Sequence, residues 1–573
     1  MWPWRLAALT VALALQLSAA EAANVATWRR NVDAIVRDVI AYHPEPFAKT
    51  GELVFRRAAT ALKGSLPDLN EEQRVVALMR LVASLGDGHT QVQLQNDRYS
   101  SWYPVRLFDF SDGYFITSAH KSVRDLTGAE VLTIAGRPVG EVVDAARSLF
   151  GADNKFDRQE RLYAVHNAFL MRGLGFARED GSLEIEVRLR NGQQAKRVLR
   201  AHETDGRYRE GVPIFEWQYR AEVYGLPFGA DEEWFSAYGD LPSSSFEVKD
   251  LNRPPFLQQR TDYTRRWLPA QSLYYIQMNH TDDSGMLPFV TEALREVDTH
   301  RPRYFVLDLR FNFGGDGSLV SQMIHQFIYR EVDQPWGDLY LVTGRKSYSA
   351  AVMVIDAFRD HTEVSLVGEP PGAALNSFGD PESFPYPELG LSVSISTLRH
   401  QLGSSADLRP SIPIDFPALM SFQDYAAGRD PVLEGLLSGD DMRSIARVAR
   451  VDGGGAARTA FLARKKRFGR LSWWTPPSEV SLRRACDALI EVQRFDDALD
   501  TCTLNTEIHP FVWNTWYNLG YAQYMAEVGE ERYRSYQCVV ELVPTNWNVP
   551  SILELFEERG VEPESAPGCP VGI

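Results

Sequence analysis

The sequence predicts a mixed α/β protein in which a core of alternating strands and helices is flanked by helical segments. Between residues 270 and 435, short apolar runs of strand length alternate with longer stretches of helical periodicity, which is typical of βαβ units. Apolar residues recur at helical spacing between residues 25 and 85. Residues 478 to 560 carry only helical patterns, so a second helical part is expected after the core.

Length and composition narrow the class of protein. With 573 residues the chain is too long for one ordinary hydrophobic core, so three or four folded parts are expected. The formal net charge is -16 and no Lys/Arg-rich run stands out, which argues against nucleic-acid binding because phosphates require a basic patch. No CxxC pattern or His/Cys cluster indicates a metal site, and we expect no cofactor.

The N-terminus has the pattern of a secretory signal peptide. Arg5 precedes an apolar run from Leu6 to Leu17 that is too short to span a bilayer, and Ala20-Glu21-Ala22 is a small-x-small cleavage site. The alternative is a membrane anchor. No later stretch is apolar enough to span a membrane, so we expect a periplasmic or secreted protein that is not an integral membrane protein once processed.

The first 200 residues are expected to pass from helices to strands. One helix ends at His43-Pro44-Glu45-Pro46 because proline cannot continue it, and a second follows Asp68-Leu-Asn-Glu-Glu72 and ends at Gly86-Asp87-Gly88. Strands are then predicted at residues 114–117, 130–136 and 183–190, with a helix at 139–149. Residues 205 to 262 carry no assignable pattern.

The core and its C-terminal extension follow. The expected core strands are 273–278, 304–310, 339–342 and 365–367, and the expected core helices are 318–329 and 350–360. A linker is predicted at Asp452-Gly-Gly-Gly-Ala-Ala457. Beyond it, His509-Pro510 and Trp513-Asn514 recur as Val543-Pro544 and Trp547-Asn548, an offset of 34 residues that equals the tetratricopeptide period. Such repeats indicate a surface for a protein partner.

All four cysteines lie in this last region, at positions 486, 502, 538 and 569. Two disulfides are expected in an exported protein, and three pairings are open. The spacing between Cys486 and Cys502 would suit a staple across a helical hairpin.

Four segments contain residues suited to nucleophilic catalysis. In Leu85-Gly-Asp-Gly-His89-Thr90 the flanking glycines leave an imidazole accessible as a general base, although a single histidine is more often structural than catalytic. After the buried strand 304–310, Gly314 and Gly315 can present backbone N–H groups to an oxyanion, unless they only form an ordinary turn.

The third segment, Gly344 to Ala351, places Ser349 at the start of a helix that follows a strand. This position exposes the hydroxyl and directs the Ala350 N–H toward a developing oxyanion, whereas the alternative is a serine that only caps the helix. The fourth, Val367 to Gly379, is a Gly/Pro-rich loop after a strand, and its Asn376 is a candidate for binding substrate.

Taken together and in this order, the GDGHT turn, the DLRxNxGG-like strand, the YSAA-type serine turn and the VGEP loop resemble peptidase family S41 of clan SK. These are the tail-specific, or C-terminal processing, proteases, and the GDGHT motif is similar to one branch of them. The resemblance covers roughly residues 25 to 435. It implies a ClpP/crotonase-like βαβ protease core, polypeptide substrates and an acyl-enzyme mechanism.

The resemblance also implies a division of the chain. A PDZ-like module, which would bind the C-terminal end of a substrate by strand addition, is expected around residues 103 to 150. The expected parts are a signal peptide at 1–22, an N-terminal helical segment leading into the core at 23–100, a PDZ-like module at 101–175, the protease core at 176–440 and a TPR-like helical domain at 460–573.

Site roles follow from the same resemblance. Ser349 matches the nucleophile, Ala350 and the Gly314-Gly315 turn match the oxyanion hole, and Asp360 matches an aspartate eleven positions after the serine. The lysine that the processing branch uses as base is replaced here by Ala374, so a Ser–Lys dyad is not available. A tricorn-like branch uses a histidine that His89 matches, although Gly88 stands where that branch has a serine.

A Ser349–His89 pair is therefore expected, with no third member assigned. Two alternatives stay open. One is an inactive relative that binds peptides or a partner through the PDZ-like and repeat parts. The other is an esterase of the α/β-hydrolase type, which is disfavoured because Ser349 lies in Lys-Ser-Tyr-Ser-Ala and not in GxSxG.

Overall fold

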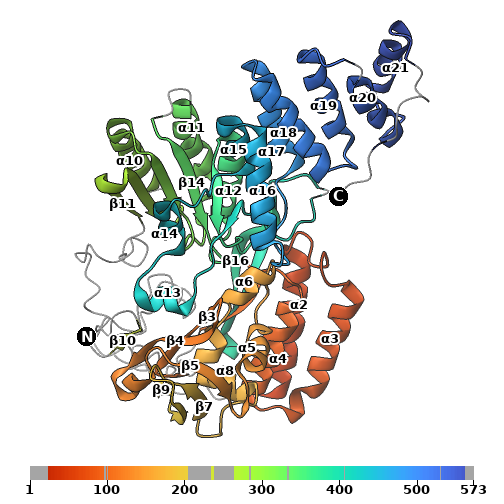
Figure 1. Cartoon of the computed structure of the whole chain (residues 1–573). Coiled ribbons are helices and arrows are strands. Elements are labelled where there is room, and N and C mark those ends of the chain that lie inside the picture. The colour runs from red at the N-terminus through yellow and green to blue at the C-terminus, as the bar shows by residue number, and fades with distance from the viewer. Residues whose placement is uncertain are drawn as a thin grey trace, which may run out of the picture. The chain divides into compact units, whose positions relative to one another are not determined.

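A computed structural model describes residues 23–95, 99, 101–203, 234–237, 263–282, 285–331, 335–405, 407–529, 531–561 and 569. The expected signal peptide at 1–22 and nearly all of 205–262 lie outside the described residues. The mixed α/β class is confirmed (Figure 1). The chain divides into two compact units. The first comprises residues 1–261, 371–411 and 420–429, and the second comprises 262–370, 412–419 and 430–573.

Three helices open the first unit, one more than the two that the sequence predicted. They are α2 (Val25–Tyr42), α3 (Glu52–Ser65) and α4 (Glu71–Ala83). Helix α2 ends at Tyr42, one residue before the His43-Pro44 sequence that blocks its continuation. Helix α4 begins after Asn70, which forms a capping box with Gln73 and so satisfies two backbone groups at the helix start.

The larger sheet of the first unit has seven strands. Its order is β10 (Trp234–Ser236), β4 (Gly113–His120), β5 (Glu130–Ile134), β7 (Leu183–Arg188) and β8 (Gln194–Leu199), with β3 (Val105–Phe110) on β4 and β6 (Arg137–Pro138) on β5. Four helices accompany it, α5 (Val139–Arg147), α6 (Lys155–Glu160), α7 (Tyr163–His166) and α8 (Ala168–Gly173). Because β7 pairs with β5, the boundary expected between residues 175 and 176 falls inside one sheet.

A smaller sheet in the same unit joins segments that are far apart in the sequence. Strands β1 (Gln91–Leu94), β17 (Leu391–Gln401) and β16 (Asn376–Tyr386) pair antiparallel in that order. The GDGHT turn lies between α4 and β1. The sheet therefore places this turn beside residues about 300 positions later. A two-stranded ribbon, β2 (Ser101–Trp102) with β9 (His202–Glu203), and helix α13 (Phe422–Ala427) complete the unit.

The second unit contains the expected βαβ core. Its sheet has the order β11 (Tyr263–Leu268), β12 (Leu273–Met278), β13 (Tyr304–Asp308), β14 (Asp338–Thr343), β15 (Ser365–Gly368) and β18 (Phe416–Pro417). Only β11 pairs antiparallel, so the carboxyl ends of β12 to β15 share one edge. The helices are α10 (Met286–His300), α11 (Val320–Glu331), α12 (Ala350–His361) and α14 (Pro431–Ser438). In such sheets, sites form at the carboxyl edge.

The linker prediction at residues 452–457 is wrong. Helix α15 (Ile445–Asp452) and helix α16 (Gly454–Phe468) are separated by Gly453 alone, which takes a φ of 95°. A methyl group on Gly454 would lie 2.6 Å from the backbone nitrogen of Thr501. The glycines therefore permit a sharp break between two helices and close packing of one helix against another. From the sequence alone, a run of glycines with these two roles looks the same as a flexible linker.

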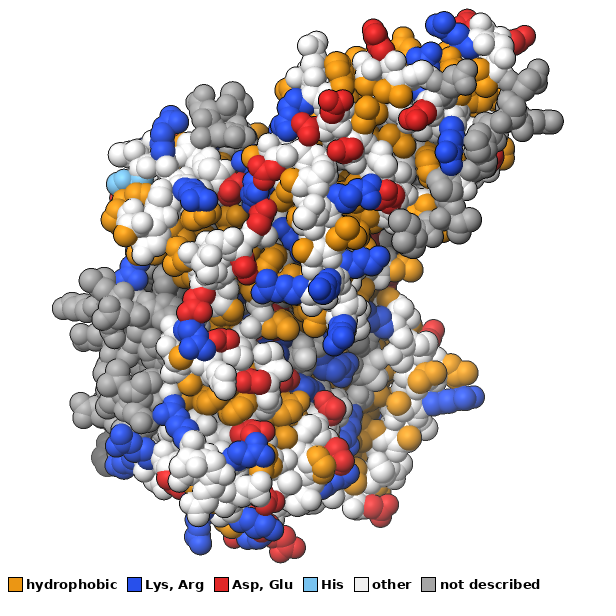
Figure 2. All heavy atoms as spheres, in the orientation of Figure 1, with side chains coloured by type: hydrophobic (Ala, Val, Ile, Leu, Met, Phe, Trp, Pro, Cys, Tyr) orange, Lys and Arg blue, Asp and Glu red, His pale blue; other side chains and the backbone are white. Residues whose placement is uncertain are grey.

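One short basic stretch was overlooked in the sequence. Lys465, Lys466 and Arg467 form the last turn of α16, where positive charge is favourable against the helix dipole. Figure 2 shows Lys and Arg side chains gathered near this helix. Arg464 in the same turn is buried and donates to the carbonyls of residues 441 and 443, and Arg467 pairs with Asp440 at 3.2 Å. Two of the four consecutive basic residues, Arg464 and Arg467, thus serve the fold.

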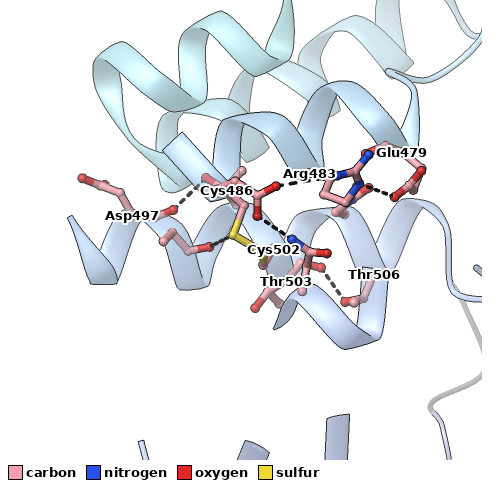
Figure 3. Close-up of a disulfide and its surroundings, with 12 residues drawn as sticks. Glu479, Arg483, Cys486, Asp497, Cys502, Thr503 and Thr506 are labelled. Carbon is pink, nitrogen blue, oxygen red and sulfur yellow. Dashed lines mark hydrogen bonds and ion pairs between the residues drawn. A yellow bond between two sulfur atoms is a disulfide. The ribbon is translucent and has the colours of Figure 1, made fainter. Parts of the chain in front are cut away.

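The C-terminal region is entirely helical in its described part, as expected. It contains α17 (Glu479–Glu491), α18 (Phe495–Ile508), α19 (Trp513–Met525), α20 (Glu531–Leu542) and α21 (Val549–Glu558). The disulfide pairing is Cys486–Cys502 and Cys538–Cys569. Figure 3 shows the first bond as a staple between α17 and α18. No helix in the described residues has the length and apolarity needed to cross a membrane.

The Cys486–Cys502 bond gives a prediction about stability. Replacing both cysteines by alanine should lower the free energy of unfolding of the helical region by about 3 kcal/mol, because the bond closes a loop of 16 residues in the unfolded chain. Urea denaturation followed by circular dichroism measures this. The double variant Cys538→Ala/Cys569→Ala serves as a comparison, and an unchanged helical transition in the first variant would contradict the prediction.

Candidate active site

Ser349 occupies a strained turn between β14 and α12. Its φ of 55° and ψ of -128° lie where residues other than glycine are rarely found. Although Ser349 stands at the N-cap position, its side chain makes no capping hydrogen bond. The interpretation of Ser349 as a helix cap therefore fails. Nucleophilic serines of hydrolases can lie on strained strand-to-helix turns of this kind, and strained residues are frequent at functional sites.

The serine turn is tied to the end of the neighbouring strand β13. The buried Ser347 hydroxyl accepts the Gly344 N–H at 3.0 Å and donates to the Leu309 carbonyl at 2.8 Å. The Tyr348 N–H donates to the Asn312 carbonyl at 3.0 Å. These hydrogen bonds fix the turn on both sides of Ser349, and they stabilise its strained backbone conformation.

The glycine loop after β13 packs directly against this turn. A methyl group on Gly314 would lie 2.6 Å from Ser349 Cβ and 2.9 Å from the Ala350 nitrogen. Gly314 and Gly315 have φ values of 110° and 137°, which other residues rarely adopt. Thr281 fixes the loop, since its N–H donates to the Gly314 carbonyl at 2.8 Å and its carbonyl accepts the Asp316 N–H at 2.7 Å. Only glycine satisfies both the approach and the backbone angles.

Two backbone N–H groups of this turn and loop have no hydrogen-bond partner within the described residues. The Ala350 N–H is the first of α12, so it has no partner within the helix and lies at the positive end of the helix dipole. Gly315 is exposed, and its N–H has no hydrogen-bond partner within the part of the chain that is described. The Gly314 N–H, in contrast, donates to Asn312 Oδ1 at 2.9 Å. Gly314 thus shapes the turn, and its N–H is already bonded and is not free for an oxyanion.

A buried charged cluster supports the base of the glycine loop. Arg310 bonds Asp308 at 3.0 Å and reaches both Asp430 oxygens, at 3.2 and 2.9 Å. Burial alone would lower the pKa of Arg310, but the two carboxylates raise it above its usual value. Burial also raises the pKa of Tyr275 well above its usual value, so its hydroxyl stays protonated and donates to Asp308 at 2.7 Å. The sequence motif contained Asp308 and Arg310 but gave no sign of Asp430.

The GDGHT turn of the first unit is organised by Asp87. This buried carboxylate accepts the His89 N–H at 3.0 Å, the Ser396 hydroxyl at 2.6 Å, the Thr90 hydroxyl, and a bond from His43 Nε2 at 3.2 Å. Burial would raise the pKa of Asp87, but these hydrogen bonds hold it well below its usual value. Asp87 therefore stays ionised and fixes the backbone that carries His89.

His43 is held in one tautomer. The Glu45 N–H donates to His43 Nδ1 at 3.1 Å, so that nitrogen carries no proton and Nε2 donates to Asp87. His43 and Ser396 were missed as supports of the turn because they come from the end of α2 and from β17. The only sequence signal for this network around Asp87 was the GDGHT motif itself.

His89 is electrostatically suited to accept a proton. Burial lowers the pKa of His89 below its usual value, and Arg161 and His400 act in the same direction, whereas Asp87 and Asp157 oppose them. The imidazole is therefore neutral at neutral pH, which is the form that a general base requires.

The predicted site residues fall into two groups. Ser349, Ala350, Gly314 and Gly315 come together in the second unit, whereas His89 and Asn376 belong to the first. The Asn376 amide nitrogen donates to the carbonyls of Ser404 at 2.8 Å and Asp407 at 3.2 Å, so it fixes a loop. No group of three or more His, Cys, Asp or Glu side chains in the described residues is arranged to hold a metal ion.

The expected role of Asp360 must be corrected. Ser349 precedes the first residue of α12 and Asp360 lies one residue before its end. At 1.5 Å of rise per residue the two are about 16 Å apart along the helix axis. Asp360 is half-exposed and pairs with Arg359 at 3.5 Å. Because eleven helical residues separate the two positions, the Asp360 side chain lies far from that of Ser349.

Solved structures identify the fold. Mature CPAF complexed with lactacystin aligns over 73% of this chain and 99% of that chain, with 9% identity and a TM-score of 0.50. The photosystem II D1 C-terminal processing protease aligns over 73% and 98%, with 12% identity and a TM-score of 0.34. The tricorn protease aligns over 72% and 37%, with 11% identity and a TM-score of 0.29. No protein-family model and no curated protein sequence matches the chain.

The chain has the fold of an S41-family peptidase, as the sequence motifs led us to expect. The likeness to CPAF carries this conclusion, since the other two TM-scores are lower. At this level of identity the likeness concerns the fold alone, and the chemistry must be argued from the residues of this chain.

The charged cluster gives a prediction about stability. Asp430→Ala should lower the free energy of unfolding by about 3 to 5 kcal/mol, because it leaves the buried Arg310 short of one partner. Asp440→Ala is the matched control, since its pair with Arg467 is solvent-exposed and should contribute less than about 1 kcal/mol. Urea denaturation of both variants measures the difference, and equal effects would contradict the proposed importance of the cluster.

Proposed function

We propose that this protein is an exported serine endopeptidase of the tail-specific type, with Ser349 as nucleophile and His89 as general base. The observation that carries the proposal is the strained turn at Ser349, whose hydroxyl does not cap α12 while the Ala350 and Gly315 N–H groups lie at the same turn and loop. The S41-type fold supports a polypeptide substrate. Strain without a capping bond is expected of a catalytic serine and not of a structural one.

The mechanism follows from the chemistry of these groups. His89 accepts the proton of Ser349 Oγ as that oxygen attacks the carbonyl carbon of a peptide bond. The Ala350 and Gly315 N–H groups stabilise the tetrahedral oxyanion. His89 then gives the proton to the leaving amine, and water, deprotonated in turn by His89, releases the acyl group from Ser349.

Export and the accessory parts belong to the same proposal. Residues 1–22 would direct the chain across a membrane to the periplasm or the medium, and the two disulfides are compatible with an oxidising compartment. Residues 101–175, together with the strands β7 and β8 that continue the same sheet, would receive the substrate end as a PDZ-like module. The 34-residue offset in the helical region supports TPR-like repeats that would bind a protein partner.

A second candidate function is peptide binding without cleavage. Ala374 favours it, because alanine cannot act as the base that the processing branch of the resembled family places there. The low pKa of His89 favours catalysis, since it keeps a neutral imidazole available.

Hydrolysis of an unfolded polypeptide separates the two candidates. Ser349→Ala should lower the rate by about 10³-fold or more, and His89→Ala by roughly 10²- to 10⁴-fold. Ser318→Ala, which changes an exposed serine at another helix start, should leave the rate unchanged. Full activity in Ser349→Ala would remove the nucleophile, and no hydrolysis by the wild type would favour peptide binding.

The glycine loop gives an independent prediction. Gly314→Ala should lower kcat by about 10²-fold, because the added methyl group displaces Ser349 or Ala350 by a fraction of an ångström or more. Gly192→Ala is the matched control, since it has a comparable φ of 83° but no atom within 4 Å of the added methyl group. Equal kinetic effects of the two substitutions would show that the contact with Ser349 does not matter.

A further inference from the structure

A second imidazole lies beside His89 within the first unit. A methyl group on Gly379 of β16 would lie 2.9 Å from Cδ2 and Nε2 of His400 and 3.9 Å from Cε1 of His89. The register of the small sheet produces this arrangement, because His400 on β17 pairs with Ser377 on β16 and β1, which follows His89, pairs with the other edge of β17. Two histidine rings that are 311 positions apart in the sequence thus converge on one glycine.

Asp380 holds the second ring. His400 Nε2 lies 2.6 Å from Asp380 Oδ2. The His400 side chain is 25% exposed and that of Asp380 is 56% exposed, so water and a bound substrate can reach the pair. A carboxylate bonded to one ring nitrogen fixes the orientation of an imidazole.

We propose that His400, held by Asp380, is a positioning residue for the general base. Its ring confines the His89 ring from the side of Gly379, and it disfavours the protonated form of His89, so that the neutral form that accepts the serine proton is kept. The inference deepens the proposed function and rests on it, and it supplies a partner for His89 that the sequence left unassigned. His400 acts through His89, so it takes no proton from Ser349 itself.

The charges around His89 show why His400 matters. Asp87 and Asp157 favour the protonated form of His89, whereas Arg161 and His400 disfavour it. Arg161 is bound to Asp157 at 2.8 Å, which partly cancels its field. Burial lowers the pKa of His89, and the electrostatic effect of His400 acts in the same direction.

The test is the pH dependence of the base. In His400→Gln the acid limb of the kcat/KM profile should move to higher pH by about half a unit to one unit, with KM little changed. Asp380→Asn should move the limb in the same direction, because it removes the carboxylate that holds the His400 ring beside His89. His120→Gln, a change to another imidazole of this unit that bonds Ser122, should leave the profile unchanged.

A direct titration keeps the inference independent of turnover. The pKa of His89, followed by the NMR signal of its Cε1 proton in the full chain, should rise in His400→Gln relative to the wild type. An unchanged His89 titration, or a uniform loss of activity without movement of the acid limb, would overturn the inference while leaving Ser349 as nucleophile. Absence of any hydrolysis that depends on Ser349 would instead overturn the proposed function, and the NMR titration would still decide the role of His400.

Discussion

The contact between the Gly314 backbone and the Ser349–Ala350 turn is the constraint on which the candidate site depends. A side chain at residue 314 would meet Ser349 Cβ and the Ala350 nitrogen, so this approach requires glycine. The contact joins the loop after β13 to the turn after β14, and both lie at the carboxyl edge of the parallel sheet. Ser347 and Asn312 then hold the turn in a conformation that a serine does not adopt freely.

The glycine loop of the second unit and the GDGHT turn of the first unit each have a buried ionic anchor. Asp308, Arg310 and Asp430 anchor the glycine loop, and Asp87 with His43 and Ser396 anchors the turn of His89. Buried charges are costly unless every partner is present, so each anchor allows one arrangement of its turn. This rigidity is what a preorganised catalytic site needs, because groups that are already oriented cost nothing to reorganise during reaction.

Much of the fold could be predicted because its signals are local. The apolar run at 304–308, the proline after α2 and the serine after β14 each indicate their structure within a few residues. The features that could not be predicted depend on contacts between residues that are far apart in the sequence. Asp360 was expected near Ser349 because it follows the serine by eleven residues, but in a helix this spacing separates the two residues by about 16 Å. The glycines at 453–455 pack against α18, and His400 reaches His89 only through the strand register.

The central claim is that Ser349 is the nucleophile, and mass-spectrometric mapping of a covalent adduct tests it most directly. After incubation of the full chain with a fluorophosphonate, the phosphonyl group should be found on Ser349 alone, because an activated serine beside oxyanion donors reacts far faster than an ordinary hydroxyl. An adduct on a different residue, or none while polypeptide is being hydrolysed, would contradict the account.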